Sequence, residues 1–147
     1  MNYTDRLGNI NLYNGDCMEF MKDVPDKYYD LAIVDPPYGL PKTSKHGRGK
    51  LKSRLINSDC IQRWDIPPNK YYFTELFRVS KEQIIWGGNY FTENLPEKSS
   101  WIVWDKMNGE SFFADGELAW CSIGGKLRIF RYLSCGFMGS HKDRDVR

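Results

Sequence analysis

The stretch Asp35-Pro36-Pro37-Tyr38 combines a carboxylate, two consecutive prolines and an aromatic ring. Each proline fixes its own φ angle and disfavours helical backbone in the residue before it, so this turn is rigid. It therefore holds the Asp35 carboxylate, the proline carbonyl groups and the Tyr38 ring in a set relation. Two acceptors suit the two N–H groups of a planar amino group, whose delocalised lone pair makes it a poor nucleophile. The ring can stack on a base flipped out of a duplex, which contributes about 1–3 kcal/mol.

The apolar run from Leu31 to Val34 leads directly into this turn. It contains β-branched residues and no polar interruption, which predicts a strand buried on both faces, as in a parallel sheet flanked by helices. Open α/β sheets bind their ligands beyond the carboxyl ends of strands, and this is where Asp35 is expected.

The other periodic segments predict an α/β protein. Asp16, three residues before Glu19, has the capping-box spacing at the head of a helix over 17–23, which Pro25 ends. Apolar residues at helical spacing follow Pro67-Pro68 and lead to a second buried strand, which gives a strand, helix, strand unit. Later strands with little room for helices between them predict an antiparallel edge or a hairpin beside the parallel strands. The expected strands are 10–13, 31–34, 83–86, 101–104, 118–122 and 127–132.

A basic loop, residues 40–58, follows the rigid turn. It has no apolar periodicity, and it contains Lys42, Lys45, Arg48, Lys50, Lys52 and Arg54 with no acidic residue among them. One interpretation is a solvated surface loop. Beside a turn suited to flipped bases, contact with DNA phosphates is the preferred interpretation, because such contacts supply much of the affinity for a duplex.

Composition excludes several classes of protein. The 147 residues are 41% hydrophobic and 27% charged, with a net charge of +2, so we expect one domain with a core and no histone-like polybasic character. The four cysteines have no metal-binding spacing, and no segment predicts secretion or membrane insertion. A cytoplasmic protein with reduced thiols is expected, with a flexible tail over 134–147.

The sequence DPPY resembles the catalytic signature of the DNA methyltransferases that modify amino groups, and more closely that of the adenine-N6 group. The segments NLYNGDCMEFMKDVP, WGGNYF, WIVWDK and GELAWCS are similar to those of members in which this motif precedes the cofactor motif. Cytosine-N4 relatives usually carry Ser in place of Asp35. The resemblance implies a Rossmann-like methyltransferase fold, double-stranded DNA as substrate, S-adenosylmethionine as cofactor and a link to restriction-modification.

The resemblance also implies residue roles. Asp35, Pro36, Pro37 and Tyr38 are the expected catalytic residues, and Asp16, Cys17 and Asp35 are the expected cofactor-binding residues. Asp16 also has the simpler interpretation of a helix N-cap.

The glycine-rich cofactor motif of the family is absent from residues 1–147, so we expect an incomplete, mostly parallel sheet with an antiparallel C-terminal edge and one partial catalytic domain. The isolated chain is then expected to bind S-adenosylmethionine at millimolar affinity or not at all. A second hypothesis is an inactive remnant that binds DNA or dimerises through an exposed sheet edge, and a complementing chain could instead complete the site. A third hypothesis is methylation of an RNA base or a glutamine amide. Asp35 argues against it, because Asn is commoner at this motif position in enzymes of that kind.

Overall fold

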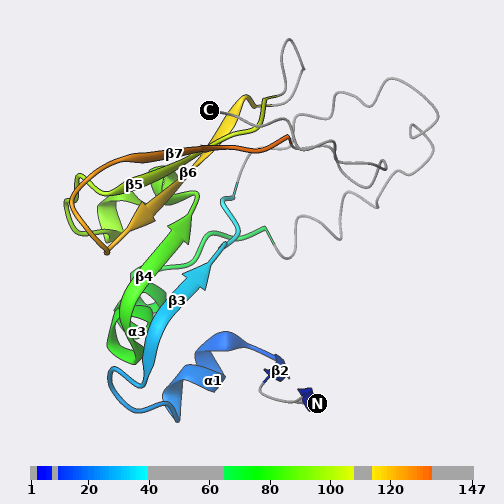
Figure 1. Ribbon diagram of the computed structural model, residues 1–147. Coiled ribbons are helices and arrows are strands. Elements are labelled where there is room, and N and C mark those ends of the chain that lie inside the picture. Colours follow the sequence, from blue (N-terminus) through cyan, green and yellow to red (C-terminus); the bar gives the residue numbers. More distant parts are fainter. Residues whose placement is uncertain (1–2, 8–9, 40–64, 108–113, 134–147) are drawn as a thin grey trace.

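The computed structural model describes residues 3–7, 10–39, 65–107 and 114–133 (Figure 1). Two α-helices and seven β-strands lie in these ranges. The helices are α1 (Cys17–Lys22) and α3 (Lys70–Val79), and two single-turn 3₁₀ helices are η2 (Gly88–Tyr90) and η3 (Thr92–Asn94). The strands are β1 (Tyr3–Leu7), β2 (Ile10–Asn14), β3 (Tyr29–Val34), β4 (Ser80–Trp86), β5 (Trp101–Asp105), β6 (Gly116–Cys121) and β7 (Arg128–Arg131).

Five of these strands form the main sheet in the order β3-β4-β6-β5-β7. The strands β3 and β4 are parallel, β6 is antiparallel to both β4 and β5, and β7 is parallel to β5. Four of the five strands therefore run in one direction, and β6 alone opposes them. The α/β class is confirmed. Of the two expected arrangements of the later strands, the antiparallel pairing of consecutive strands is present as β5-β6, but the antiparallel edge is wrong, because the edge strand β7 is parallel to β5.

The helix α3 connects the parallel strands β3 and β4, as the sequence predicted. The N-cap of α3 is Asn69, whose side-chain oxygen accepts hydrogen bonds from the backbone N–H groups of Tyr71 and Tyr72. This cap satisfies two of the N–H groups that have no partner inside a helix. The buried face of α3 packs on the sheet in one cluster formed by Phe73, Leu76, Ile85, Phe91 and Trp120.

The strand β3 is buried on one face only, which corrects the expectation from its continuous apolar run. Ala32 and Val34 pack against the core under α3, whereas Leu31 is 40% exposed and Ile33 is 63% exposed. The strand also lies at an edge of the described sheet. A run of apolar residues shows that a strand avoids water, but it does not show which neighbours cover each face.

The N-terminal segment forms a separate two-stranded antiparallel sheet, β1-β2, followed by α1. Asp16 is the N-cap of α1 and accepts a hydrogen bond from the N–H group of Met18 at 2.8 Å. The predicted capping box is only half correct, because the carboxylate of Glu19 pairs with Lys22 at 2.7 Å. The helix α1 ends at Lys22, close to the expected residue 23.

The guanidinium of Arg78, on α3, joins α1 to α3. It donates hydrogen bonds of 2.7 Å to the carbonyl groups of Met21 and Val24, and it pairs with Glu75 and Asp26. The Met21 carbonyl at the end of α1 also accepts from the N–H group of Val24, so Arg78 adds a second donor there from the neighbouring helix. This connection fixes α1 beside the carboxyl end of α3.

Neither helix in the described ranges is long and apolar enough to span a membrane. The basic loop over 40–58 lies outside the described residues, as does the expected tail over 134–147.

Candidate active site

The turn Asp35-Pro36-Pro37-Tyr38 follows the carboxyl end of β3, as the sequence predicted. Asp35 is exposed, whereas Pro36 is buried beneath it. The turn ends at Gly39, which has a left-handed φ of +66° and donates its N–H to the Asp65 carboxylate at 3.0 Å. A side chain at Gly39 would also meet Pro67, so this position favours glycine twice over.

Asp35 and Tyr38 contact each other directly. The Tyr38 hydroxyl donates a hydrogen bond to Oδ1 of Asp35. Burial raises the pKa of Tyr38 well above its ordinary value of 10.0, and the hydrogen bond to Asp35 and the negative charges of Asp35 and Glu117 raise it further. The phenol is therefore neutral at physiological pH, and the carboxylate keeps a second oxygen for another donor.

The Tyr38 ring lies at the end of the neighbouring strand β4. Its centroid is 4.8 Å from that of Tyr90 with an interplanar angle of 22°, and 6.1 Å from that of Phe91. Gly87, with a φ of +65°, passes so close that a Cβ atom there would lie 2.1 Å from Cε1 of Tyr38. The turn at Gly87-Gly88 follows β4 and leaves room for Tyr38, which follows the neighbouring strand β3.

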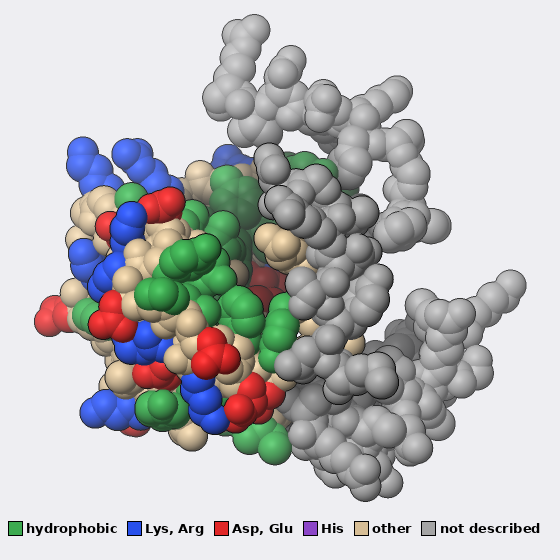
Figure 2. Space-filling model, turned by 90° about the horizontal axis from the view of Figure 1, so that it is seen from below, with side chains coloured by type: hydrophobic (Ala, Val, Ile, Leu, Met, Phe, Trp, Pro, Cys, Tyr) green, Lys and Arg blue, Asp and Glu red, His purple; other side chains and the backbone are tan. Residues whose placement is uncertain are grey.

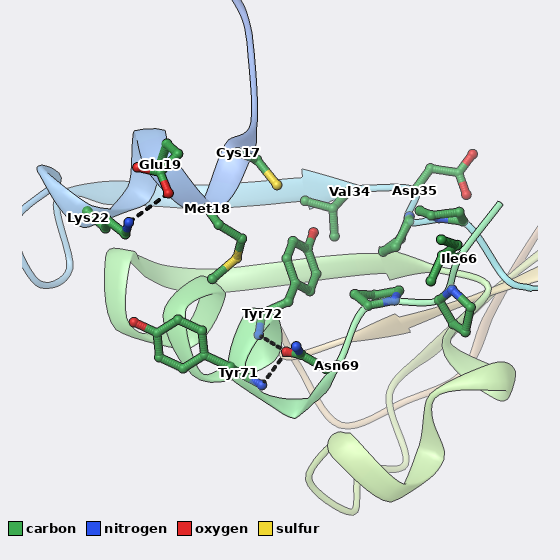
Figure 3. Close-up of a pocket in the computed structure, with 14 residues that line it drawn as sticks. Cys17, Met18, Glu19, Lys22, Val34, Asp35, Ile66, Asn69, Tyr71 and Tyr72 are labelled. Carbon is green, nitrogen blue, oxygen red and sulfur yellow. Dashed lines mark hydrogen bonds and ion pairs between the residues drawn. The ribbon is translucent and has the colours of Figure 1, made fainter. Parts of the chain in front are cut away.

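A cavity of about 890 Å³ lies between α1, the carboxyl end of β3 and the amino end of α3 (Figure 3). This volume is in the range of small-molecule sites. In Figure 3 the side chains of Cys17, Met18, Val34 and Tyr72 lie around one space below β3. The lining residues are Cys17, Met18, Glu19, Lys22, Val34, Asp35, Pro36, Pro37, Ile66, Pro67, Pro68, Asn69, Tyr71 and Tyr72.

The cavity brings together residues from distant parts of the chain that the sequence assigned to one site. Cys17 and Asp35 both line it, and Asp16 lies next to Cys17 as the helix cap. Burial and the neighbouring Asp16 charge raise the pKa of Cys17, so its thiol is neutral. Burial raises the pKa of Tyr72 to about 12, so its hydroxyl is a neutral donor and acceptor.

The carboxyl end of β5 lies on the same side of the sheet as the carboxyl ends of β3 and β4, because the three strands run in the same direction. Asp105 is the last residue of β5, and both it and the next residue, Lys106, pair with residues of other strands. Asp105 pairs with Arg131 at 3.1 Å, and Lys106 pairs with Glu117 and lies over the Trp104 ring. Both side chains hold the later strands together.

The six expected DNA-binding residues, Lys42, Lys45, Arg48, Lys50, Lys52 and Arg54, lie outside the described residues and stay a prediction. On the face shown in Figure 2, basic and acidic side chains of the described residues are interspersed, with hydrophobic side chains between them. That face therefore has charges of both signs.

No family model matches this chain. Two curated proteins are similar to it. The type II methyltransferase M.BamHI of Bacillus amyloliquefaciens is 35% identical over 100 residues, which cover 68% of this chain and 20% of the relative. The type II methyltransferase M2.MboI of Moraxella bovis is 30% identical over 119 residues, which cover 68% of this chain and 42% of the relative.

This chain is related to the type II DNA methyltransferases. The resemblance predicted from DPPY is therefore confirmed. The chain spans less than half the length of either relative, 20% of one and 42% of the other. Among the described residues, the main sheet is mixed, and its first parallel strand, β3, leads into the DPPY turn.

Two residues of this site were not singled out from the sequence. Tyr72 was assigned only to the helix that follows Pro67-Pro68, and the contact of Tyr90 with Tyr38 was not expected. The adjacency of two parallel strands was the available signal, because residues just beyond β3 and β4 must lie at one sheet edge.

Proposed function

We propose that this chain carries the amino-group site of an S-adenosylmethionine-dependent methyltransferase that modifies N6 of adenine in DNA. One observation supports this most strongly: Asp35 and Cys17 line the same cavity, and Asp35 also contacts the hydroxyl of Tyr38. Asp35 thus lies between a space suited to a small cofactor and a ring suited to a base. Relatedness to type II methyltransferases supports the same reaction class.

The turn acts on the amino group of the target base. A carboxylate oxygen of Asp35 and the carbonyl oxygen of Pro36 accept its two N–H groups, which localises the lone pair on N6. That lone pair would form the new N–C bond to the methyl group of the bound cofactor as its S–C bond breaks and the neutral thioether leaves, and N6 would release one proton to water. The Tyr38 ring stacks on the flipped base and holds the nitrogen in line, which contributes about 1–3 kcal/mol.

The lining of the cavity is compatible with the proposed cofactor. Apolar walls from Val34, Ile66 and the Pro67-Pro68 pair suit a flat adenine ring. Asp35 and the Glu19–Lys22 ion pair add acceptors and a donor for ribose hydroxyls. When bound, S-adenosylmethionine supplies a methyl group activated by its sulfonium. Cys17 and Tyr72 are neutral, so they contribute apolar surface and hydrogen-bonding groups rather than charge.

Adenine is the proposed target because the motif begins with Asp35, whereas relatives that modify cytosine N4 usually have Ser at this position.

The test is methyl transfer to unmethylated genomic DNA, which offers every short recognition sequence. Isotope-labelled S-adenosylmethionine is supplied at millimolar concentration, since weak binding is expected, and the nucleosides are separated by mass spectrometry. We expect labelled N6-methyladenine from the wild type and at least about a hundredfold less from Asp35→Ala, because a charge-assisted hydrogen bond and the orientation it gives are lost. Asp30→Ala is the matched control, since Asp30 is an exposed carboxylate on the same strand that pairs with Lys81. Labelled N4-methylcytosine would contradict the adenine assignment.

A second candidate is a non-catalytic module that binds DNA or pairs with another chain. The exposed side chains of Leu31 and Ile33 on the edge strand β3 favour it, because a bare apolar edge is a place for strand pairing. This candidate predicts that the wild-type chain transfers no label. It also predicts that the chain dimerises, or binds a second, different chain, in analytical ultracentrifugation, and that Ile33→Lys abolishes this association. Transfer by a monomeric wild type would exclude it.

A further inference from the structure

Tyr90 lies where it can control the orientation of Tyr38. It is 50% exposed, and it is the last residue of η2, which follows β4. We infer that Tyr90 is a positioning residue, which holds the Tyr38 ring in the orientation that receives the base. The functional part of this inference rests on the proposed function, whereas the structural part stands on the contacts between the two rings.

The two rings form a stacked pair. Their centroids are 4.8 Å apart and their planes differ by 22°. Offset stacking of aromatic rings is favourable at centroid separations of about 4.5–7 Å. The contact joins two turns that are 52 positions apart in the sequence but lie at the ends of the adjacent parallel strands β3 and β4.

The turn that carries Tyr90 is itself fixed to the core. The N–H group of Gly87 donates to the carbonyl of Leu118 at 2.8 Å, and the N–H group of Tyr90 donates to the carbonyl of Gly87 at 2.8 Å. The next residue, Phe91, is 3% exposed and belongs to the main core cluster. A ring attached to this rigid turn can restrain a neighbour, which a ring on a free loop could not do.

The closeness of Gly87 defines the remaining space around Tyr38. A Cβ atom at Gly87 would lie 2.1 Å from Cε1 and 2.6 Å from Cζ of the Tyr38 ring. The ring is therefore restricted by backbone at Gly87, by the Tyr90 ring and by the hydrogen bond from its own hydroxyl to Asp35. If the Tyr90 ring is removed, the Tyr38 ring can move away from the Gly87 backbone into the space that is left. The Tyr38 hydroxyl then loses its fixed direction.

The structural experiment uses the whole chain labelled with ¹³C-tyrosine and observed by NMR. The Tyr38 signal is assigned by its loss in Tyr38→Phe. We expect Tyr90→Ala to shift and broaden the Tyr38 ring signal, and Tyr90→Phe to leave it near its wild-type position, because phenylalanine keeps the stack. Tyr28→Ala is the matched control, since Tyr28 is an exposed tyrosine packed on a neighbouring ring, that of Tyr29, at the far end of β3.

The functional experiment separates positioning from cofactor binding and from folding. In transfer to unmethylated genomic DNA, we expect Tyr90→Ala to lower kcat about two- to tenfold, the range for loss of an aromatic pair, with KM for S-adenosylmethionine unchanged. Tyr90→Phe should restore kcat. A Tyr38 signal unaffected by Tyr90→Ala would overturn the inference, as would unchanged kcat. An inactive wild type would contradict the proposed function instead, and the NMR result would still decide whether Tyr90 positions Tyr38.

Discussion

Two aspartates lie at the carboxyl ends of strands that run in the same direction, and only one has the surroundings of an active residue. Oδ1 of Asp35, after β3, accepts from the neutral hydroxyl of Tyr38, and the residue lines a cavity. Asp105, at the end of β5, has both oxygens engaged: Oδ2 accepts from Arg131 and Oδ1 from the N–H group of Met107. The partners of a carboxylate at a strand end therefore decide whether it is structural or available to substrate.

The largest expected difference between these two turns is in methyl transfer. Asp35→Ala is expected to lower single-turnover transfer at least about a hundredfold, because the amino group loses an acceptor and its alignment. Asp105→Ala removes a carboxylate already committed to its own loop, so transfer should change less than about threefold, which corresponds to the contribution of an exposed ion pair. Both variants are measured by quenched-flow assays with labelled cofactor. Equal losses in the two variants would remove the distinction.

The DPPY turn also depends on Gly87, which follows the adjacent strand β4. Substitution of this glycine is expected to give the next largest effect, on the free energy of unfolding. Gly87→Ala places a Cβ atom against the Tyr38 ring at a positive φ, whereas Gly124→Ala has a similar φ of +75° and nothing within 4 Å. Backbone strain is therefore common to both variants, and only Gly87→Ala adds overlap. Urea unfolding should show Gly87→Ala less stable than Gly124→Ala by about 1–3 kcal/mol, the usual cost of overpacking.

Combining Gly87→Ala with Tyr38→Ala checks the cause. The double variant should lose the extra destabilisation, since the overlapping ring is gone. If the penalty persisted without the Tyr38 ring, the proposed close approach would not be its origin.

The Tyr38 ring itself separates stacking from hydrogen bonding. Tyr38→Ala should lower transfer about tenfold or more, because stacking on a base contributes about 1–3 kcal/mol. Tyr38→Phe should retain most of the activity, although it removes the hydrogen bond to Asp35. Binding of S-adenosylmethionine, followed by calorimetry, should change little in either variant. Comparable losses in both would identify the hydroxyl, rather than the ring face, as the active group.

Local sequence signals predicted most of the strand and helix positions and the rigid turn. The cap at Asp16 and the strand over Leu31 to Val34 depend on interactions within a few residues. Propensity and periodicity are therefore enough to predict where the helix begins and where the strand ends. The DPPY turn was found for the same reason, since proline geometry is local.

Features that depend on distant residues could not be deduced in this way. The interior position of β6 depends on which strands pair, and the exposure of Ile33 depends on what covers the second face of β3. Glu19 had two available partners, and the nearby Lys22 forms the observed pair. The stacking of Tyr38 on Tyr90 requires the register of β3 against β4, which no local pattern gives.

The smallest expected effect concerns the ion pair in the second turn. The side chains of Asp105 and Arg131 are 37% and 57% exposed, so water and salt screen their attraction. A double-mutant cycle with Asp105→Ala and Arg131→Ala, measured by urea unfolding, should give a coupling free energy below about 1 kcal/mol. In 1 M NaCl, where the screening length is about 3 Å, this coupling should fall further. A coupling above about 2 kcal/mol that resists salt would mean that Asp105 anchors β7 strongly. Removing Asp105 would then disturb the main sheet at β7, the edge opposite β3, and its use as an inert counterpart to Asp35 would no longer be justified.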